Sequence, residues 1–224
     1  MDSMENGISL KHRIIISVGQ LACILTSFLT EYVPNYHGQS PLVFFAFLTH
    51  VSNSLLCVLN LCNCFKTFRS KTNVTHFCIT CSFFVLTAWI ALVVPFNVST
   101  LENPVSLVEH ICPAILQASM LVAPPPPPRI IFIFCGYAYL ILYLSWTLIF
   151  SLAGFTLNGN DYIYKAINWS YHPWLSLIYV SVALGMYTVV YFSVECITLM
   201  RRHTMSKKKT FDVTKGNPDG TIEV

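Results

Sequence analysis

Charged residues are scarce in this chain of 224 residues: they make up 10% of it, and Asp and Glu together number 10. A soluble domain usually carries about 25% charged residues, so the composition excludes an ordinary water-soluble fold. Hydrophobic residues supply 54% of the chain, which fits lipid as its main solvent. Little polar sequence lies outside the apolar runs, and this leaves no room for a separate soluble domain.

The apolar residues form six runs, each long enough for a membrane-crossing helix, which needs about 20 residues. The runs cover residues 14–33, 41–65, 77–96, 105–123, 130–157 and 173–200. We therefore predict an all-α, polytopic membrane protein with six transmembrane helices in one domain, residues 14–200. Residues 1–13 are expected to form a cytoplasmic N-terminal segment and residues 201–224 a basic, disordered cytoplasmic tail. The first run lacks a clear small-residue cleavage site, so we expect an uncleaved anchor.

Lysines and arginines are distributed unevenly between the two sides of this arrangement. With a cytoplasmic N-terminus, Lys165 lies outside and the other 12 of the 13 basic residues lie inside. The positive-inside rule therefore predicts that both termini are cytoplasmic, in the endoplasmic reticulum or the plasma membrane. We interpret the basic cluster after Met200 as a topology signal that can also contact anionic lipid headgroups, and not as a nucleic-acid-binding segment.

Two of the apolar runs contain polar residues that are costly in lipid. The second run contains Thr49-His50-Val51-Ser52-Asn53, and the fourth contains Glu109-His110. Ionisable groups near the bilayer centre cost roughly 3 kcal/mol or more, so they usually face a cavity or a partner. At a rise of 1.5 Å per residue, Thr49 lies roughly 12 Å and His110 roughly 8 Å below the outer helix ends. The pattern predicts a buried polar site in which the two side chains come within hydrogen-bond reach.

A hydroxyl beside an imidazole is the minimal apparatus for covalent acyl transfer. In this interpretation Thr49 is the nucleophile and His110 is the base. Asn53 follows Thr49 by one helical turn and could donate a hydrogen bond to the developing oxyanion. Glu109 could orient the imidazole, and Ser52 is a further supporting residue. No metal and no other cofactor is expected in this chemistry.

The same polar face leaves other interpretations open. For Asn60 and Asn63, nearer the inner end of the second run, we favour hydrogen bonds that tie helices together. A continuous polar path would instead indicate a small-solute transporter or channel, in which Glu195 could serve as a gate or proton site. A non-catalytic lipid-binding membrane protein is another alternative.

A metal site is the remaining chemical alternative, because imidazole and carboxylate ligands suit zinc. Histidines and acidic residues gather at or near the predicted outer side, although no pair has the i, i+4 spacing of a helical zinc motif. They are His37, His50, His110, His172, Glu102, Glu109 and Asp161.

Two features concern the predicted loops. The five prolines Pro124–Pro128 predict a stiff polyproline II spacer of roughly 15 Å between the fourth and fifth helices. Asn168 begins the sequon Asn168-Trp169-Ser170 on the predicted outer side, which makes it the candidate site for N-glycosylation.

Three short motifs give the chain a resemblance to a known family. They are Phe47-Leu48-Thr49-His50-Val51-Ser52-Asn53 in the second run, Leu107-Val108-Glu109-His110 with Pro113 in the fourth, and Asp161-Tyr162-Ile163-Tyr164 after the fifth. In order and spacing they resemble the androgen-induced, FAR-type family of six-helix membrane hydrolases and its bacterial six-helix relatives.

The resemblance implies an activity as well as a fold. Animal members of the family cleave the ester bond in fatty acid esters of hydroxy fatty acids with a threonine nucleophile and a histidine. Those roles would fall on Thr49 and His110 of this chain. The resemblance therefore implies a lipid ester as substrate and membrane lipids as the surroundings of the site.

Overall fold

The computed structural model of the chain describes residues 9–33, 47–65, 74–96, 103–122, 130–155, 163–164 and 167–216, with side chains up to residue 207. Most of these residues are helical, and no β-strand is formed among them. The α-helices are α1 (Leu10–Ser27), α3 (Leu48–Cys62), α5 (Thr75–Ala88), α6 (Pro104–Ala118), α7 (Ile131–Leu152) and α8 (Pro173–Gly216). Short turns extend three of them: η1 (Phe28–Tyr32) follows α1, η3 (Trp89–Val93) and η4 (Val94–Phe96) follow α5, and η6 (Ser119–Val122) follows α6.

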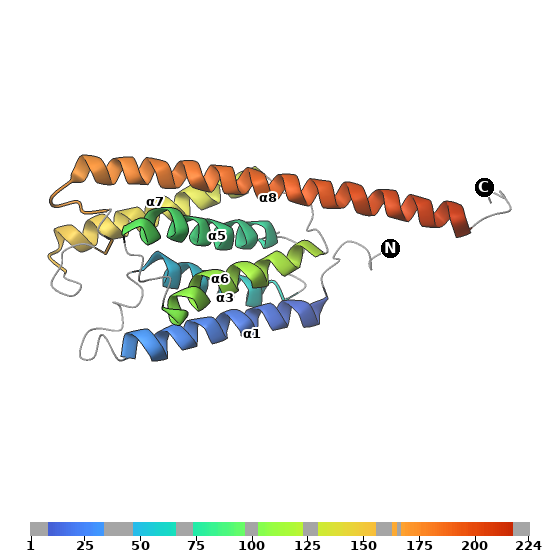
Figure 1. Cartoon of the computed structure of the whole chain (residues 1–224), viewed down its shortest axis with the longest axis horizontal. Helices are drawn as coiled ribbons and strands as arrows, with labels where there is room; N and C mark the ends of the chain where they lie inside the picture. The colour runs from blue at the N-terminus through green and yellow to red at the C-terminus, as the bar shows by residue number, and fades with distance from the viewer. Residues whose placement is uncertain are drawn as a thin grey trace.

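The helices lie side by side in a bundle (Figure 1). The start of α1 and the last turns of α8 lie at the same end of it, as expected for an even number of crossings. Two helix starts carry caps: the Ser9 side chain accepts from the His12 N–H, and Asn103 accepts from the Val105 N–H ahead of α6. Such caps satisfy backbone donors that have no partner within the helix.

Five of the described helical segments are long and apolar enough to cross a membrane. They cover Leu10–Thr30, Thr75–Val93, Pro104–Leu121, Ile131–Leu152 and Pro173–Lys207. The second expected span is described as the 15-residue helix α3, roughly 22 Å long at 1.5 Å per residue. Residues 41–46 of that expected span lie outside the described residues, as does the proline run 124–128. The fold is therefore that of a multi-pass membrane protein, with five candidate spans and a shorter apolar helix.

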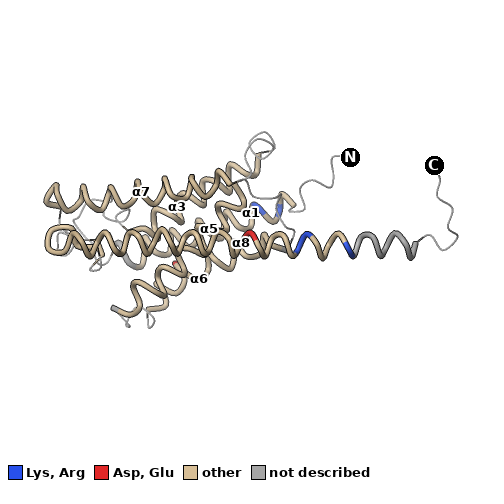
Figure 2. Tube along the Cα trace, turned by 90° about the horizontal axis from the view of Figure 1, so that it is seen from above, with Lys and Arg blue, Asp and Glu red and all other residues tan. Residues whose placement is uncertain are grey.

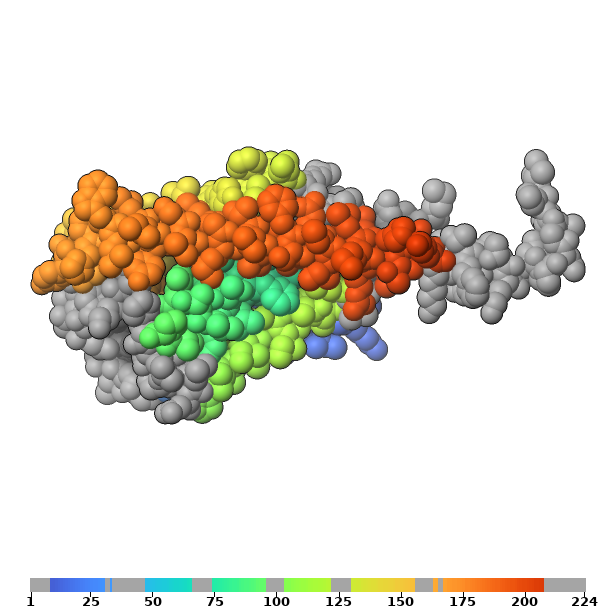
Figure 3. Space-filling view, turned by 45° about the horizontal axis from the view of Figure 1, so that its top comes forward, coloured from blue at the N-terminus to red at the C-terminus, as the bar shows by residue number. Residues whose placement is uncertain are grey.

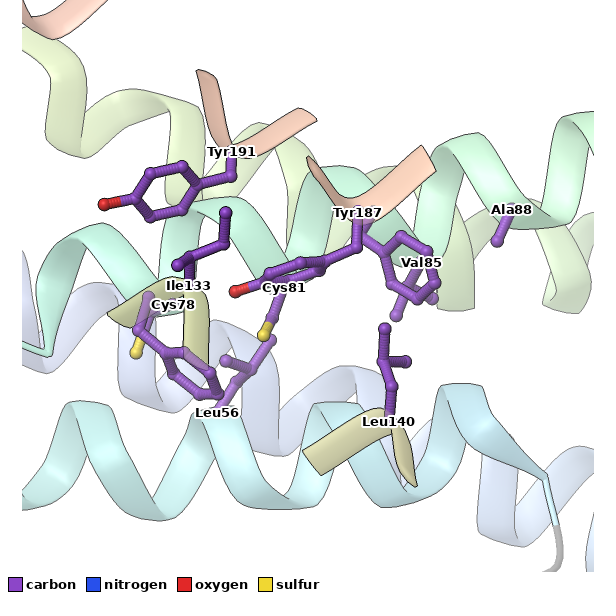
Figure 4. Packing of buried hydrophobic residues seen from close by; sticks show 11 residues of the cluster. Leu56, Cys78, Cys81, Val85, Ala88, Ile133, Leu140, Tyr187 and Tyr191 are labelled. Atoms are coloured by element: carbon purple, nitrogen blue, oxygen red, sulfur yellow. The ribbon is translucent and has the colours of Figure 1, made fainter. Parts of the chain in front are cut away.

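Helix α5 occupies the middle of the bundle, where it contacts α3, α6, α7 and α8. Its buried residues include Phe84, which packs edge-on against the fully buried ring of Tyr187 from α8. Leu56 of α3 and Leu140 of α7 complete the centre of this apolar cluster (Figure 4). The cluster joins four helices and fixes the position of α3, which supplies part of the polar site, and of α5, which leads into η3.

The outer surface of the bundle is strongly apolar, whereas its interior contains polar side chains. Leu, Ile, Val and Phe side chains are exposed along α1, α7 and α8, while Gln20, Asn60 and Gln117 are fully buried. The space-filling view shows α8 lying along α5 with its outward side uncovered (Figure 3). A water-soluble protein rarely exposes so much contiguous apolar surface, so this face is suited to lipid.

Helix α8 extends well beyond the boundary expected at Met200, and it ends at Gly216. The expectation of a disordered tail is therefore wrong for residues 201–216, while 217–224 lie outside the described residues. Lysine and arginine are good helix formers, and no glycine or proline lies between Met200 and Gly216. The described Lys and Arg residues of α1 and α8 gather at this end of the molecule (Figure 2).

Candidate functional site

Thr49 and His110 form a direct hydrogen bond between α3 and α6. The distance between Thr49 Oγ1 and His110 Nε2 is 2.9 Å, and both residues are buried. The contact expected from the two apolar runs is therefore present. It places a buried hydroxyl against a buried imidazole inside the bundle.

The second ring nitrogen of His110 determines which atom is the proton donor in this pair. His110 Nδ1 lies 2.7 Å from the backbone carbonyl oxygen of Ser106. A carbonyl oxygen can only accept, so Nδ1 must carry the proton of the neutral imidazole. His110 Nε2 then has a free lone pair and accepts from the Thr49 hydroxyl. This is the arrangement that a base needs in order to activate a nucleophile.

The Ser106 carbonyl orients the imidazole of His110, and the orienting role expected for the Glu109 side chain stays a prediction. On a helix, a side chain leans over the turn that precedes it, so the Ser106 carbonyl is within reach of His110. Glu109 projects about 100° away around the helix axis. Its backbone carbonyl instead accepts a hydrogen bond of 3.1 Å from Asn53 Nδ2.

Asn53 and Ser52, the other supporting candidates, both link α3 to neighbouring helices. Because Asn53 donates one amide hydrogen to α6, its second amide hydrogen is the one left for a ligand. The Ser52 hydroxyl lies 2.7 Å from the hydroxyl of Tyr139 on α7. Ser52 therefore points to a different neighbour from Thr49 and Asn53, and it serves the packing of α3 against α7.

Trp89 is part of the site, although sequence reasoning did not single it out. Its indole ring stacks on the His110 imidazole, and it is the first residue of the π-helical turn η3. The Val94 N–H bonds to the Trp89 carbonyl, five residues earlier, so the ring is displaced from the regular helix position. Such π-turns occur often at functional sites, but a sequence pattern rarely reveals them.

Tyr164 closes the N-terminal end of α3. Its hydroxyl oxygen accepts a hydrogen bond of 3.0 Å from the backbone N–H of Leu48, the residue before Thr49. The Tyr143 hydroxyl of α7 bonds to the same oxygen. Burial raises the pKa of Tyr164 to about 12, so its hydroxyl stays protonated. The resemblance had drawn attention to this tyrosine without giving it a role.

The inner part of the polar stripe connects helices. Asn60 Nδ2 donates to Gln20 Oε1 of α1 at 2.8 Å, and Asn63 Nδ2 donates to Thr75 Oγ1 of α5 at 3.0 Å. These contacts match the interhelical role that the sequence favoured for both asparagines. Gln117 is also fully buried, and neither of its amide atoms has a hydrogen-bond partner in the described part of the chain.

A second buried Thr–His pair shows what distinguishes Thr49 from an ordinary helical threonine. Thr80 Oγ1 lies 3.4 Å from His76 Nδ1, one turn earlier on the same helix, but it donates to the His76 carbonyl at 2.9 Å. The Thr80 proton is therefore engaged by a backbone acceptor that cannot take it up. Thr80 and His76 cannot act as nucleophile and base in this arrangement.

The residues that the structure describes do not support the alternative of a metal site. Within them, no three His, Cys, Asp or Glu side chains come together as metal ligands. His37, Glu102 and Asp161 lie outside the described residues, and His172 is exposed. The Asn168 side chain is largely buried and accepts from the Tyr171 N–H, so a glycan there would require local opening.

Comparison with known proteins identifies no relative, so the function has to be argued from the geometry of the site. No protein-family model, no curated protein and no solved structure matches the chain.

Proposed function

We propose that this protein is an intramembrane hydrolase of lipid esters, with Thr49 as nucleophile and His110 as base. The observation that carries the proposal is the tautomer of His110. Its Nδ1–H is held by the Ser106 carbonyl, so the lone pair on Nε2 is directed at the Thr49 hydroxyl. The proposal also agrees with the resemblance of three short motifs to six-helix membrane hydrolases, which implies the same two roles.

The proposed reaction has two stages. In the first, the Thr49 hydroxyl proton passes to His110 Nε2 while Oγ1 bonds to the ester carbonyl carbon. The intermediate then collapses, the ester C–O bond breaks, and the leaving alkoxide takes the proton from His110. In the second stage, water gives a proton to His110 Nε2 as its oxygen attacks the acyl carbon. The bond between that carbon and Thr49 Oγ1 then breaks, Oγ1 takes the proton back from His110, and the fatty acid is released.

The proposed setting is the outer or lumenal leaflet of a six-helix bundle with both termini in the cytoplasm. The positive-inside pattern of the basic residues supports this orientation. Thr49 is near the start of α3 and His110 is in the first half of α6, which supports a site nearer the outer end than the inner end. A lipid ester could enter such a site laterally from the membrane, and its acyl chain would remain in an apolar environment.

The test is hydrolysis by the full-length protein in lipid nanodiscs, with the palmitoyl ester of hydroxystearic acid as substrate. Wild type and Thr49→Ser should release fatty acid, because serine keeps the nucleophilic oxygen. Thr49→Ala and His110→Ala should lose the activity. Thr80→Ala is the matched control, since it removes a buried threonine near a histidine, and it should stay active. Equal rates for Thr49→Ala and wild type would contradict the proposal.

The transporter alternative has less support. A polar path would need the inner amides to face a channel, yet Asn60 and Asn63 each donate to a neighbouring helix. These contacts join α3 to α1 and α5, which supports a packing role for this part of the polar stripe.

A further inference from the structure

The Tyr164 hydroxyl combines three properties that a simple packing contact does not require. It lies at the first turn of α3, because its oxygen accepts from the Leu48 N–H at 3.0 Å. Tyr143 is hydrogen-bonded to Tyr164, and with Tyr143 as the donor the Tyr164 oxygen accepts twice. A phenolic oxygen that accepts twice still has its own hydrogen to donate.

The position of this hydrogen relates directly to the proposed nucleophile. Leu48 precedes Thr49 in the chain, so the Tyr164 oxygen lies against the backbone of the helical turn that carries the Thr49 hydroxyl. That turn is the N-terminal end of α3, where unpaired N–H groups and the helix dipole favour negative charge. A carbonyl oxygen that becomes negative next to Thr49 would therefore develop its charge beside the start of the helix.

From this arrangement we infer that Tyr164 is a catalytic hydrogen-bond donor, which stabilises the oxyanion formed when Thr49 attacks an ester carbonyl. The inference rests on the proposed function and adds a third residue to it. In the acylation step, Thr49 Oγ1 bonds to the carbonyl carbon and its proton passes to His110 Nε2. The carbonyl π-electron pair moves onto the oxygen, and Tyr164 donates its hydrogen bond there. Tyr164 keeps its proton throughout the step.

This role explains why one hydroxyl group and one backbone amide surround the Tyr164 oxygen. The Leu48 N–H and the Tyr143 hydroxyl withdraw electron density from the Tyr164 oxygen, which strengthens it as a donor. The protonated state that burial imposes on Tyr164 is the state that donation requires. Preorganised donors of this kind account for large rate effects, because they need no rearrangement when charge appears.

The test compares Tyr164→Phe with wild type in lipid nanodiscs, using p-nitrophenyl octanoate and the palmitoyl ester of hydroxystearic acid. We expect kcat to fall roughly 100-fold or more while KM changes less than about threefold, because the lost bond forms mainly in the transition state. Tyr137→Phe is the matched control: Tyr137 hydrogen-bonds to Thr188 on α8, and its variant should keep the wild-type kcat.

Replacing Tyr164 with 3-fluorotyrosine distinguishes a catalytic donor from a hydroxyl with only a structural role. Fluorination makes the hydroxyl a better donor and a poorer acceptor, so an oxyanion donor should keep kcat at or above the wild-type value. A hydroxyl that only accepts from Leu48 would instead lose activity on fluorination.

The outcomes separate the two proposals. Hydrolysis that requires Thr49 but tolerates Tyr164→Phe would overturn the role of Tyr164 and leave the hydrolase intact. Absence of Thr49-dependent hydrolysis in wild type would overturn both. A rise in KM with kcat unchanged would assign Tyr164 to substrate binding and contradict the oxyanion role.

Discussion

The indole ring of Trp89 lies almost parallel to the imidazole of His110, with ring centroids 4.6 Å apart and an angle of 19° between the planes. Trp89 is itself only 4% exposed, so its own packing holds it firmly against His110. Three contacts thereby define the imidazole: Ser106 at Nδ1, Thr49 at Nε2 and Trp89 on one face. The stack restricts rotation of the ring out of the plane that joins Ser106 to Thr49.

Replacing Trp89 with leucine should slow ester hydrolysis without abolishing it. Stacked aromatic pairs contribute about 0.5–1.5 kcal/mol beyond their buried area, which corresponds to roughly a 2- to 12-fold change in rate. Trp89→Phe keeps a ring against His110 and should lose less than Trp89→Leu. The measurement is kcat in nanodiscs, with the exposed Trp174→Leu as control. Equal activity of Trp89→Leu and wild type would show that the stack has no part in positioning His110.

Asn53 and Asn63 offer a matched comparison between the site and the inner half of the bundle. Each donates one side-chain bond to a neighbouring helix, Asn53 to Glu109 and Asn63 to Thr75. Such bonds are worth about 0.6–1.7 kcal/mol in membrane proteins, or about 1–7 °C in melting temperature. We expect both leucine variants to lower the apparent melting temperature in detergent, and Asn53→Leu alone to lower kcat. Loss of kcat in both would indicate a general effect of destabilisation.

Gly136 should not tolerate a side chain. The ring of Tyr187 occupies the place that a Cβ of residue 136 would take, whereas a Cβ at Gly185 would have open space. Overpacking a core usually costs about 1–3 kcal/mol, so Gly136→Ala should lower the apparent melting temperature by several degrees. Gly185→Ala should leave it unchanged or raise it, because alanine favours the helix. Equal melting of the two variants would show that α7 and α8 can separate at no cost.

Gln117 should be replaceable by an apolar residue. It is fully buried, and within the described residues both of its amide atoms lack a partner, which is an unfavourable state for a polar group. Methionine has a similar shape, so Gln117→Met should raise the apparent melting temperature, by roughly 2–4 °C for each kcal/mol added to the free energy of unfolding. The kcat should stay within about twofold of the wild-type value. A large loss of hydrolysis would show that the amide serves the site, for example by holding a water molecule.

The contact between Thr49 and His110 could be predicted because polar residues stand out in apolar runs and because depth follows from helix rise. The interhelical role of Asn60 followed from the same logic. The sequence offered Glu109 as a residue that could orient His110, but it could not point to the Ser106 carbonyl at Nδ1, because backbone carbonyls are not distinguished by residue type. Trp89 was missed because its contribution depends on a π-turn.

For the fold, the apolar helices were predicted correctly, whereas the length of α8 was not. Apolar composition predicted the membrane-crossing helices, and the described bundle contains five candidate spans with α3 as a shorter helix. The length of α8 was underestimated, because its basic segment was taken as a solvated tail. A helix of lysine, arginine and threonine can equally remain solvated on all sides, so polarity alone did not determine whether residues 201–216 are ordered. Six crossings with both termini in the cytoplasm stay a prediction.

The most direct test of the account is covalent labelling by a fluorophosphonate. The full-length protein is incubated with the probe in nanodiscs, and the modified residue is located by mass spectrometry of its peptides. Attack of Thr49 Oγ1 on phosphorus with loss of fluoride should place the phosphonyl group on Thr49. Labelling should disappear in Thr49→Ala and fall sharply in His110→Ala, while Thr80→Ala keeps it. An unlabelled Thr49 in folded wild type, or labelling that persists in Thr49→Ala, would contradict an activated threonine at this site.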